Sequence, residues 1–261
     1  FENGVLTGKG FSYGGSRIRP EATGFGAVYY LQNVLEHEGE KIEGKTIACA
    51  GFGNVTWGIC KKAAELGAKV VTLSGPDGYV YDPDGITTQE KFDFMLSMRA
   101  AGEDRVEAYA DRFGVEFYAG KKPWEVPVDI AMPCATQNEL DVEDAVMLVA
   151  NNVRYYVEAA NMPATAEALK LLRLSPRILT AGSKASGSGG VVVSALEMVQ
   201  NSVRYSWSRK EVDDRLRSIM NNIYDLSAAA AAEYDLGYDL IAGSDIAAFK
   251  KISEAMIAQG L

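Results

Sequence analysis

The stretch from Lys45 to Gly58 constrains the fold more than any other part of the sequence. An apolar run at residues 45–50 leads directly into Gly51-Phe52-Gly53, and a helical pattern follows. In a βα turn of this kind, the first glycine permits a tight turn and the second lets backbone N–H groups approach a pyrophosphate. Thr56 stands where a third glycine or an alanine is usual. The fingerprint is incomplete, but its place between a strand and a helix strengthens it.

Strand and helix patterns alternate along most of the chain. Short apolar runs predict strands at residues 45–50, 69–73, 115–117, 128–132, 154–158 and 178–180. Helical patterns occupy residues 20–35, 54–66, 87–100, 103–112, 141–149 and 164–173, with turn-rich segments at 74–78 and 82–85. This alternation predicts an α/β fold: a doubly wound, Rossmann-like, mostly parallel sheet with helices on both faces.

The last part of the chain has helical patterns alone, at residues 189–204, 209–234 and 239–259. We expect an interdomain tail at 1–18, a dinucleotide-binding domain at 19–204, and a C-terminal helical segment at 205–261 that packs on it. An apolar face repeats at helical spacing in that segment. Its members are Leu216, Ile219, Met220, Ile223 and Leu226. If part of this face is exposed, the chain will be a weak self-associate rather than a monomer.

Composition narrows the classes of partner. The chain has 261 residues, of which 48% are hydrophobic and 23% charged, as in an ordinary globular protein. Its net charge of −9 argues against nucleic acid and membrane surfaces as partners. No apolar run approaches the ~18–20 residues of a membrane span. Residues 1–4 lack the basic and apolar regions of a signal peptide. We therefore expect a cytoplasmic protein.

The residues suited to metal or nucleophilic chemistry are few. The chain has one histidine, His37, in a polar stretch, and three cysteines without C-x-x-C spacing, Cys49, Cys60 and Cys134. One histidine cannot complete a metal cluster, and it has no plausible Ser-His or Cys-His partner. We predict no metal site and no catalytic residue in this chain. We expect reduced cysteines that pack in the core, although Cys134 lies just past a strand, near a possible ligand.

Small, amide and hydroxyl side chains recur in the loops after the predicted strands. In an open α/β sheet, ligands bind beyond the carboxyl ends of the strands, and amides suit ribose hydroxyls and a carboxamide. The loops are 51–55, 74–77, 133–138, 159–163 and 182–190. Such residues make turns in any protein, but five loops of this kind on one sheet edge indicate a ligand site.

The loop after the second strand bears on the choice of cofactor. An acid about 20 residues past the glycines often holds the adenosine ribose, and Asp77 is the nearest candidate. No Lys or Arg occurs between Lys69 and Lys91, so the 2′-phosphate of NADP would find no cation in this loop. We expect NAD to be preferred over NADP, unless a basic residue from elsewhere reaches the site.

Several longer motifs follow one another in the chain. They are Arg19-Pro-Glu-Ala-Thr-Gly-Phe-Gly26, Ala50-Gly-Phe-Gly-Asn-Val55, Pro133-Cys-Ala-Thr-Gln-Asn138, Glu158-Ala-Ala-Asn-Met-Pro163, Ser183-Lys-Ala185, Gly189-Gly-Val191 and Glu197-Met-Val-Gln-Asn-Ser202. Together they resemble the Glu/Leu/Phe/Val amino-acid dehydrogenases over essentially the whole chain, most closely the hexameric glutamate dehydrogenases. The segment from Ser74 to Tyr79 is similar to that of NAD-preferring bacterial members. The resemblance implies that the full enzyme converts L-glutamate and NAD to 2-oxoglutarate, ammonia and NADH.

The same resemblance implies roles for individual residues. The nicotinamide end would contact Thr23 and Asn161. The pyrophosphate would be held by Gly51, Phe52, Gly53, Asn54 and Val55. The adenosine would be flanked by Ser74, Pro76 and Asp77. The path between them would be lined by Ala135, Thr136 and Asn138. The substrate would touch Val191 and Ser194, with Ser194 reaching its side-chain carboxylate.

Two features depart from the family pattern. Family members usually have an asparagine at the position of Gly187, inside a run, Ser186–Gly190, that resembles a designed flexible loop. Losing that amide would weaken binding about ten- to a hundredfold, since an unpaired buried polar group costs ~1–3 kcal/mol. Members also carry an N-terminal domain with the catalytic lysine and aspartate, and nothing here matches it. The resemblance therefore implies a chain that binds NAD but turns over glutamate poorly or not at all.

Two alternatives stay open. One is a domain of a leucine-, valine- or phenylalanine-type dehydrogenase, against which Ser194 argues because it suits an acidic substrate. The other is a non-catalytic nucleotide-binding domain or engineered scaffold, which the Gly-Ser run and the unmatched domain favour.

Overall fold

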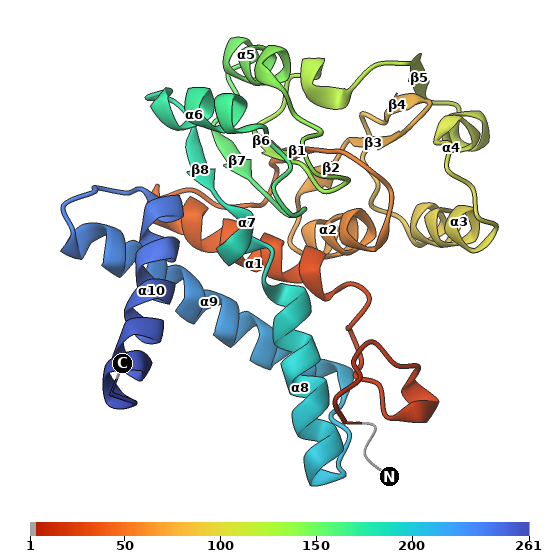
Figure 1. The fold of residues 1–261 in the computed structure, drawn as a ribbon. Helices are drawn as coiled ribbons and strands as arrows, with labels where there is room; N and C mark the ends of the chain where they lie inside the picture. Colours follow the sequence, from red (N-terminus) through yellow and green to blue (C-terminus); the bar gives the residue numbers. More distant parts are fainter. Residues whose placement is uncertain (1–3, 261) are drawn as a thin grey trace.

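The computed structural model describes residues 4–260. A five-stranded parallel sheet forms its centre (Figure 1), with the strand order β2-β1-β6-β7-β8. The strands are β1 (Thr46–Cys49), β2 (Lys69–Val70), β6 (Ile130–Met132), β7 (Tyr155–Val157) and β8 (Leu179–Ala181). The order reverses between β1 and β6, so the loops after these strands flank the switch point of a doubly wound sheet. The predicted fold class is confirmed.

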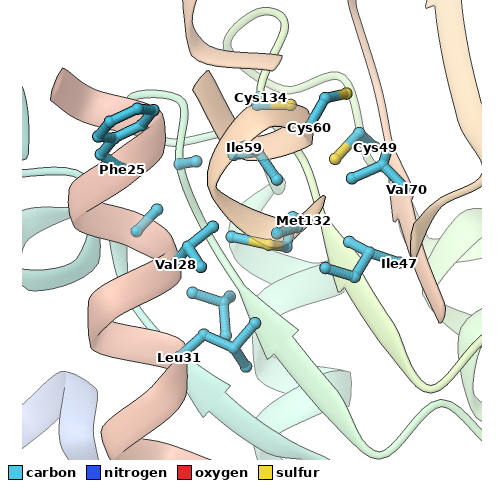
Figure 2. Close-up of a cluster of buried hydrophobic side chains, with 14 of the residues drawn as sticks. Phe25, Val28, Leu31, Ile47, Cys49, Ile59, Cys60, Val70, Met132 and Cys134 are labelled. Atoms are coloured by element: carbon cyan, nitrogen blue, oxygen red, sulfur yellow. The ribbon is translucent and has the colours of Figure 1, made fainter. Parts of the chain in front are cut away.

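Helices cover both faces of this sheet. They are α1 (Ala22–His37) and α2 (Asn54–Glu65) on one face, and α5 (Val142–Ala150) and α6 (Ala166–Leu174) on the other. Figure 2 shows the first face, where Ile47, Cys49 and Met132 pack with α1 and α2. Because successive strand residues point to opposite faces, Ala48 and Ala131 are buried under α5 and α6 instead. Burial on both faces explains why these strands have continuous apolar sequences.

Helix α1 lies close to two neighbouring helices, which brings the starts of three helices together. A Cβ atom on Gly24 would collide with the backbone of Val55 in α2. A Cβ atom on Gly26 would lie 2.7 Å from the Cα of Gly189, at the start of α8 (Gly189–Val203). Only glycine permits these approaches, and they position the helix starts that form the site.

A second, antiparallel sheet occupies part of the segment predicted as turns. Its strands are β3 (Thr72–Gly75), β4 (Gly78–Tyr81) and β5 (Glu116–Ala119). Between β4 and β5 the chain forms the helices α3 (Gln89–Ala100) and α4 (Glu107–Phe113). The predicted strand at 69–73 divides between the two sheets, and the helix predicted from residue 103 begins at Glu107. Gly75 pairs with Gly78 around a Pro76-Asp77 tip. These residues are strong turn signals, and they hid the short strand that follows them.

The remaining helices are α7 (Ser183–Ser186), α8, α9 (Arg209–Glu233) and α10 (Leu240–Ala258). The flexible loop expected at residues 186–190 is wrong. Ser186 is buried, and its hydroxyl donates to the carbonyl oxygens of Glu158 and Gly182. The long helix α9 packs against α1, and α10 packs along α9. On the apolar face of α9, Leu216 and Met220 are buried, whereas Leu226 is 54% exposed.

The N-terminal segment runs beside α8 and contains a 3-10 turn at Phe11–Tyr13. The buried carboxylate of Glu197 accepts hydrogen bonds from the backbone N–H groups of Gly8 and Lys9, and Lys9 Nζ pairs with it at 2.7 Å. Residues 1–3 of the predicted tail lie outside the described residues. The boundaries at 18/19 and 204/205 stay predictions. Across residues 4–260, no helix has the length and apolar character needed to cross a membrane.

Candidate functional site

The glycine turn lies at the carboxyl end of β1. Gly51 has a φ of +76°, a left-handed conformation that favours glycine. Its N–H donates to Ser74 Oγ at 2.8 Å, which ties the turn to β3. Gly53 is the N-cap of α2, and a Cβ atom there would meet nothing within 4 Å. The backbone at the start of α2 is thus open to close approach by an anionic ligand.

A cavity of about 670 Å³ opens beside this turn. We call it the strand-end cavity; its walls are the glycine turn, the end of β3, Arg99, residues 102–104, Lys122 to Trp124, and the loop after β6. The predicted cofactor residues that line it are Gly51, Phe52, Gly53, Ser74, Pro76, Ala135 and Thr136. Trp124, only 1% exposed, supplies an apolar wall. A concave, largely apolar recess with a few polar groups suits a nucleoside.

A second cavity, of about 790 Å³, lies between the starts of α1 and α8 and the loops after β6 and β7. We call it the α1–α8 cavity. The predicted residues that line it are Thr23, Val55, Ala135, Asn161, Val191 and Ser194. Cys134 and Ala135 line both cavities. The two recesses therefore meet at the switch point of the sheet, one on each side of the glycine turn.

Arg19 is a site residue that the sequence analysis missed. Its Nε donates to Ser194 Oγ at 2.7 Å, and both residues line the α1–α8 cavity. Among residues 4–260, Arg19 forms no ion pair with a carboxylate, whereas Lys184 in the same lining pairs with Asp245 at 2.7 Å. The Ser194 hydroxyl accepts from Arg19 and keeps its own proton to donate. Together they can bind a ligand carboxylate. Arg19 lies four residues before Thr23, but only the fold brings it to Ser194, which is 175 residues later in the chain.

Three predicted cofactor residues lie outside both linings: Asn54, Asp77 and Asn138. The carboxylate of Asp77 accepts hydrogen bonds from the backbone N–H groups of Val106 and Glu107, each at 3.0 Å, at the start of α4. The N–H of Asn138 donates to Met162 O at 3.0 Å. Asp77 thus fixes the segment after α3, and its ribose role stays a prediction.

Two cations from outside the β3 loop reach the strand-end cavity. Arg99 lines it half-buried and, within the described chain, forms no ion pair with a carboxylate; burial lowers the pKa of its guanidinium. Lys122 also lines it, but its Nζ is held by Asp144 at 2.6 Å and Asp141 at 3.0 Å. Arg99 is therefore the distant basic residue that bears on the NAD preference.

Thr56 occupies the third glycine position of the fingerprint and stabilises the backbone directly before the glycine turn. It is fully buried, and its hydroxyl donates to Ala50 O at 3.2 Å, while Cys134 Sγ donates to the same oxygen at 2.8 Å. Cys49, Cys60 and Cys134 are all buried and free, as expected (Figure 2). Burial raises the pKa of the Cys49 and Cys60 thiols, which keeps them neutral and weakly reactive. Residues 4–260 contain no group of three or more His, Cys, Asp or Glu side chains that could hold a metal.

Gly187 lines the α1–α8 cavity at the end of α7. Its N–H donates to Ser183 O at 2.9 Å, and a Cβ atom there would lie 2.7 Å from that oxygen. An asparagine at this position would therefore need a small shift of the local backbone.

The model of the Glutamate/Leucine/Phenylalanine/Valine dehydrogenase family matches residues 14–260. The chain belongs to this family. It is 60% identical over 261 residues to the NAD-specific glutamate dehydrogenase of Clostridium symbiosum, covering 100% of this chain and 58% of that protein. It is 45% identical over 258 residues to the NADP-specific glutamate dehydrogenase of Haemophilus influenzae, covering 98% of this chain and 57% of that protein. A solved glutamate dehydrogenase structure superposes with a TM-score of 0.99 at 60% identity, covering 100% of this chain and 58% of that one.

The chain spans little more than half the length of these family members. The family and its α/β fold are therefore established for this chain.

Proposed function

We propose that this chain binds NAD across the two cavities and forms the cofactor-binding part of a glutamate dehydrogenase. The observation that carries the proposal is the position of the glycine turn, at the junction of a mostly apolar recess and a cationic one. Residues 51–55 would hold the pyrophosphate. Ser74 and Pro76 would flank the adenosine, and Thr23 and Asn161 would hold the nicotinamide end. Bound NAD supplies the nicotinamide ring that takes a hydride from the α-carbon of the amino acid.

The substrate assignment rests on Arg19 and Ser194. A guanidinium donates two parallel hydrogen bonds to a carboxylate, and Ser194 Oγ, 2.7 Å from Arg19 Nε, adds a third donor. The side-chain carboxylate of L-glutamate or 2-oxoglutarate would satisfy this pair. The aliphatic or aromatic side chain of a leucine-, valine- or phenylalanine-type substrate would leave the pair desolvated without a partner, at a cost of about 1–3 kcal/mol or more.

The preference for NAD over NADP is supported by the β3 loop, which lacks Lys and Arg. Relatives at 60% and 51% identity are named NAD-specific, and one at 45% is named NADP-specific. Arg99, in the strand-end lining, is a feature that would favour a 2′-phosphate.

This chain is proposed to be catalytically poor by itself. Proton transfer needs a group poised within hydrogen-bond reach of the substrate. Lys184, the lysine in the described lining of the α1–α8 cavity, is paired with Asp245 and is largely exposed. The cytoplasmic location stays a prediction.

Calorimetric titration with NAD, followed by turnover of glutamate at saturating NAD, tests both halves of the proposal. We expect one NAD bound per chain and little or no change in nicotinamide absorbance with glutamate. Absence of NAD binding would overturn the cofactor assignment, and fast turnover would overturn the account of the incomplete catalytic machinery.

A further inference from the structure

Glu139 is a partly buried carboxyl group in the wall of the strand-end cavity, and none of the roles described above uses it. It follows the loop after β6, close to the point where the two cavities meet. Its Oε1 accepts a hydrogen bond from the N–H of Ala135 at 3.0 Å. The carboxyl group therefore holds the backbone at Ala135, which lines both cavities.

The surroundings of Glu139 disfavour a negative charge there. Burial raises its pKa to about 7, although the N–H groups of Ala135 and Thr136 oppose the shift. Lys122 lines the same cavity, but Asp141 and Asp144 hold its ammonium group. Within the described chain, Glu139 forms no ion pair of its own. Both the protonated and the ionised form of this carboxyl group are therefore populated near neutral pH.

Apart from Arg99, which lines the same cavity half-buried, the other titratable groups around Glu139 do not supply a compensating charge. Asp144 in α5 adds repulsion. Burial raises the pKa of the Tyr156 hydroxyl in β7 and of the Cys49 thiol in β1, so both are neutral. Across the cavity, Glu103 and Asp104 are exposed to water, which screens them.

A bound dinucleotide adds two phosphate charges beside this wall and displaces water from the cavity. Both effects penalise an ionised carboxylate and favour its protonated form. We propose that Glu139 takes up a proton when NAD binds, so that cofactor affinity depends on pH through this single side chain. The inference rests on the proposed NAD-binding function. By linkage, a ligand that favours the protonated acid binds more tightly at low pH and more weakly as the pH rises.

Calorimetry of NAD binding in two buffers with different ionisation enthalpies counts the protons taken up. At pH about 7, we expect uptake of roughly half a proton per NAD, and affinity should fall roughly three- to tenfold between pH about 6.5 and about 8.5. Glu139→Gln keeps the size of the side chain but cannot titrate. It should bind NAD without proton uptake and with an affinity that does not change over this range.

Glu143→Gln is the matched control, because Glu143 is an exposed acid in the first turn of α5. It should behave as the wild-type chain does. NAD binding by the wild-type chain without proton uptake overturns the inference and leaves the proposed function intact, and this result needs no variant. Proton uptake that persists in a folded Glu139→Gln chain also overturns it. Absence of NAD binding altogether removes the proposed function, and the inference with it.

Discussion

The strand-end cavity and the α1–α8 cavity share a wall at Cys134 and Ala135 but differ in how they can recognise a ligand. The first is built from turns and apolar side chains around an open helix start, so it offers shape and backbone N–H groups. The second carries the Arg19 guanidinium, hydrogen-bonded to the Ser194 hydroxyl, so it offers charge. Under the proposed function, the strand-end cavity holds the adenosine end of NAD, whereas the α1–α8 cavity takes the nicotinamide end and selects the substrate. Substitutions should therefore separate the two roles.

The largest effect should come from placing a charge at the open start of α2. Gly53→Asp adds a good N-cap residue where a Cβ atom meets nothing within 4 Å, so folding should be kept. The new carboxylate would repel a pyrophosphate, and we expect NAD affinity to fall roughly a hundredfold or more. Titration calorimetry measures this. Gly53→Asn, also a good cap but neutral, should lose far less. Equal losses in both variants would mean that the turn does not hold an anion.

Arg19→Ala should affect the other cavity alone. Removing a charged hydrogen-bond donor costs about 1.5–3 kcal/mol, so the affinity of the NAD-saturated chain for 2-oxoglutarate should fall roughly ten- to a hundredfold. Affinity for NAD alone should change less than about twofold. Arg17→Ala, which removes a nearby exposed arginine, is the control and should leave both affinities unchanged. A large loss of NAD affinity in Arg19→Ala would contradict the separation of roles, because it would show that Arg19 contributes to cofactor binding as well as to substrate binding.

Glu139→Gln should change stability in a pH-dependent way. The folded-state pKa of about 7 lies above the ordinary value of 4.5, so the stability that this group contributes is full at low pH and is lost as the pH rises through 7. Glutamine avoids that loss. Between pH about 5 and about 8, the variant should gain roughly 2–3 kcal/mol in the free energy of unfolding relative to the wild-type chain. Urea unfolding at both values measures it. A gain of the same size at both pH values would contradict burial as the cause.

The smallest effect should be on the choice between NAD and NADP. NAD should bind more tightly, and Arg99→Ala should lower NADP affinity roughly three- to tenfold while changing NAD affinity by less than about twofold. Competition titrations of the two cofactors measure the ratio. Lys61→Ala controls for the loss of one positive charge, since Lys61 is half-buried in α2 with its ammonium group over the Trp57 ring and lines neither cavity. An unchanged ratio of NAD to NADP affinity in Arg99→Ala would show that Arg99 does not act on the 2′-phosphate at the adenosine end of the cofactor.

The sequence predicts the fold well where burial is two-sided. Strands such as Ile130–Met132 are apolar throughout, and their place between helices is unambiguous. It fails at Gly78–Tyr81, because the glycine and proline residues that close a hairpin give the same signal as an irregular loop. At Asp77 the sequence does not reveal that the carboxylate accepts hydrogen bonds from the start of α4, and the ribose role of this residue stays a prediction. Arg19, Arg99 and Glu139 escape notice because only the tertiary fold brings them to the strand ends.

The most direct test of the central claim is a structure of this chain with NAD bound. The account predicts the pyrophosphate at residues 51–55, the adenosine in the strand-end cavity between Phe52 and Pro76, and the nicotinamide in the α1–α8 cavity beside Thr23 and Asn161. An ordered NAD molecule that lies outside these two cavities, or that enters only one of them, would contradict it.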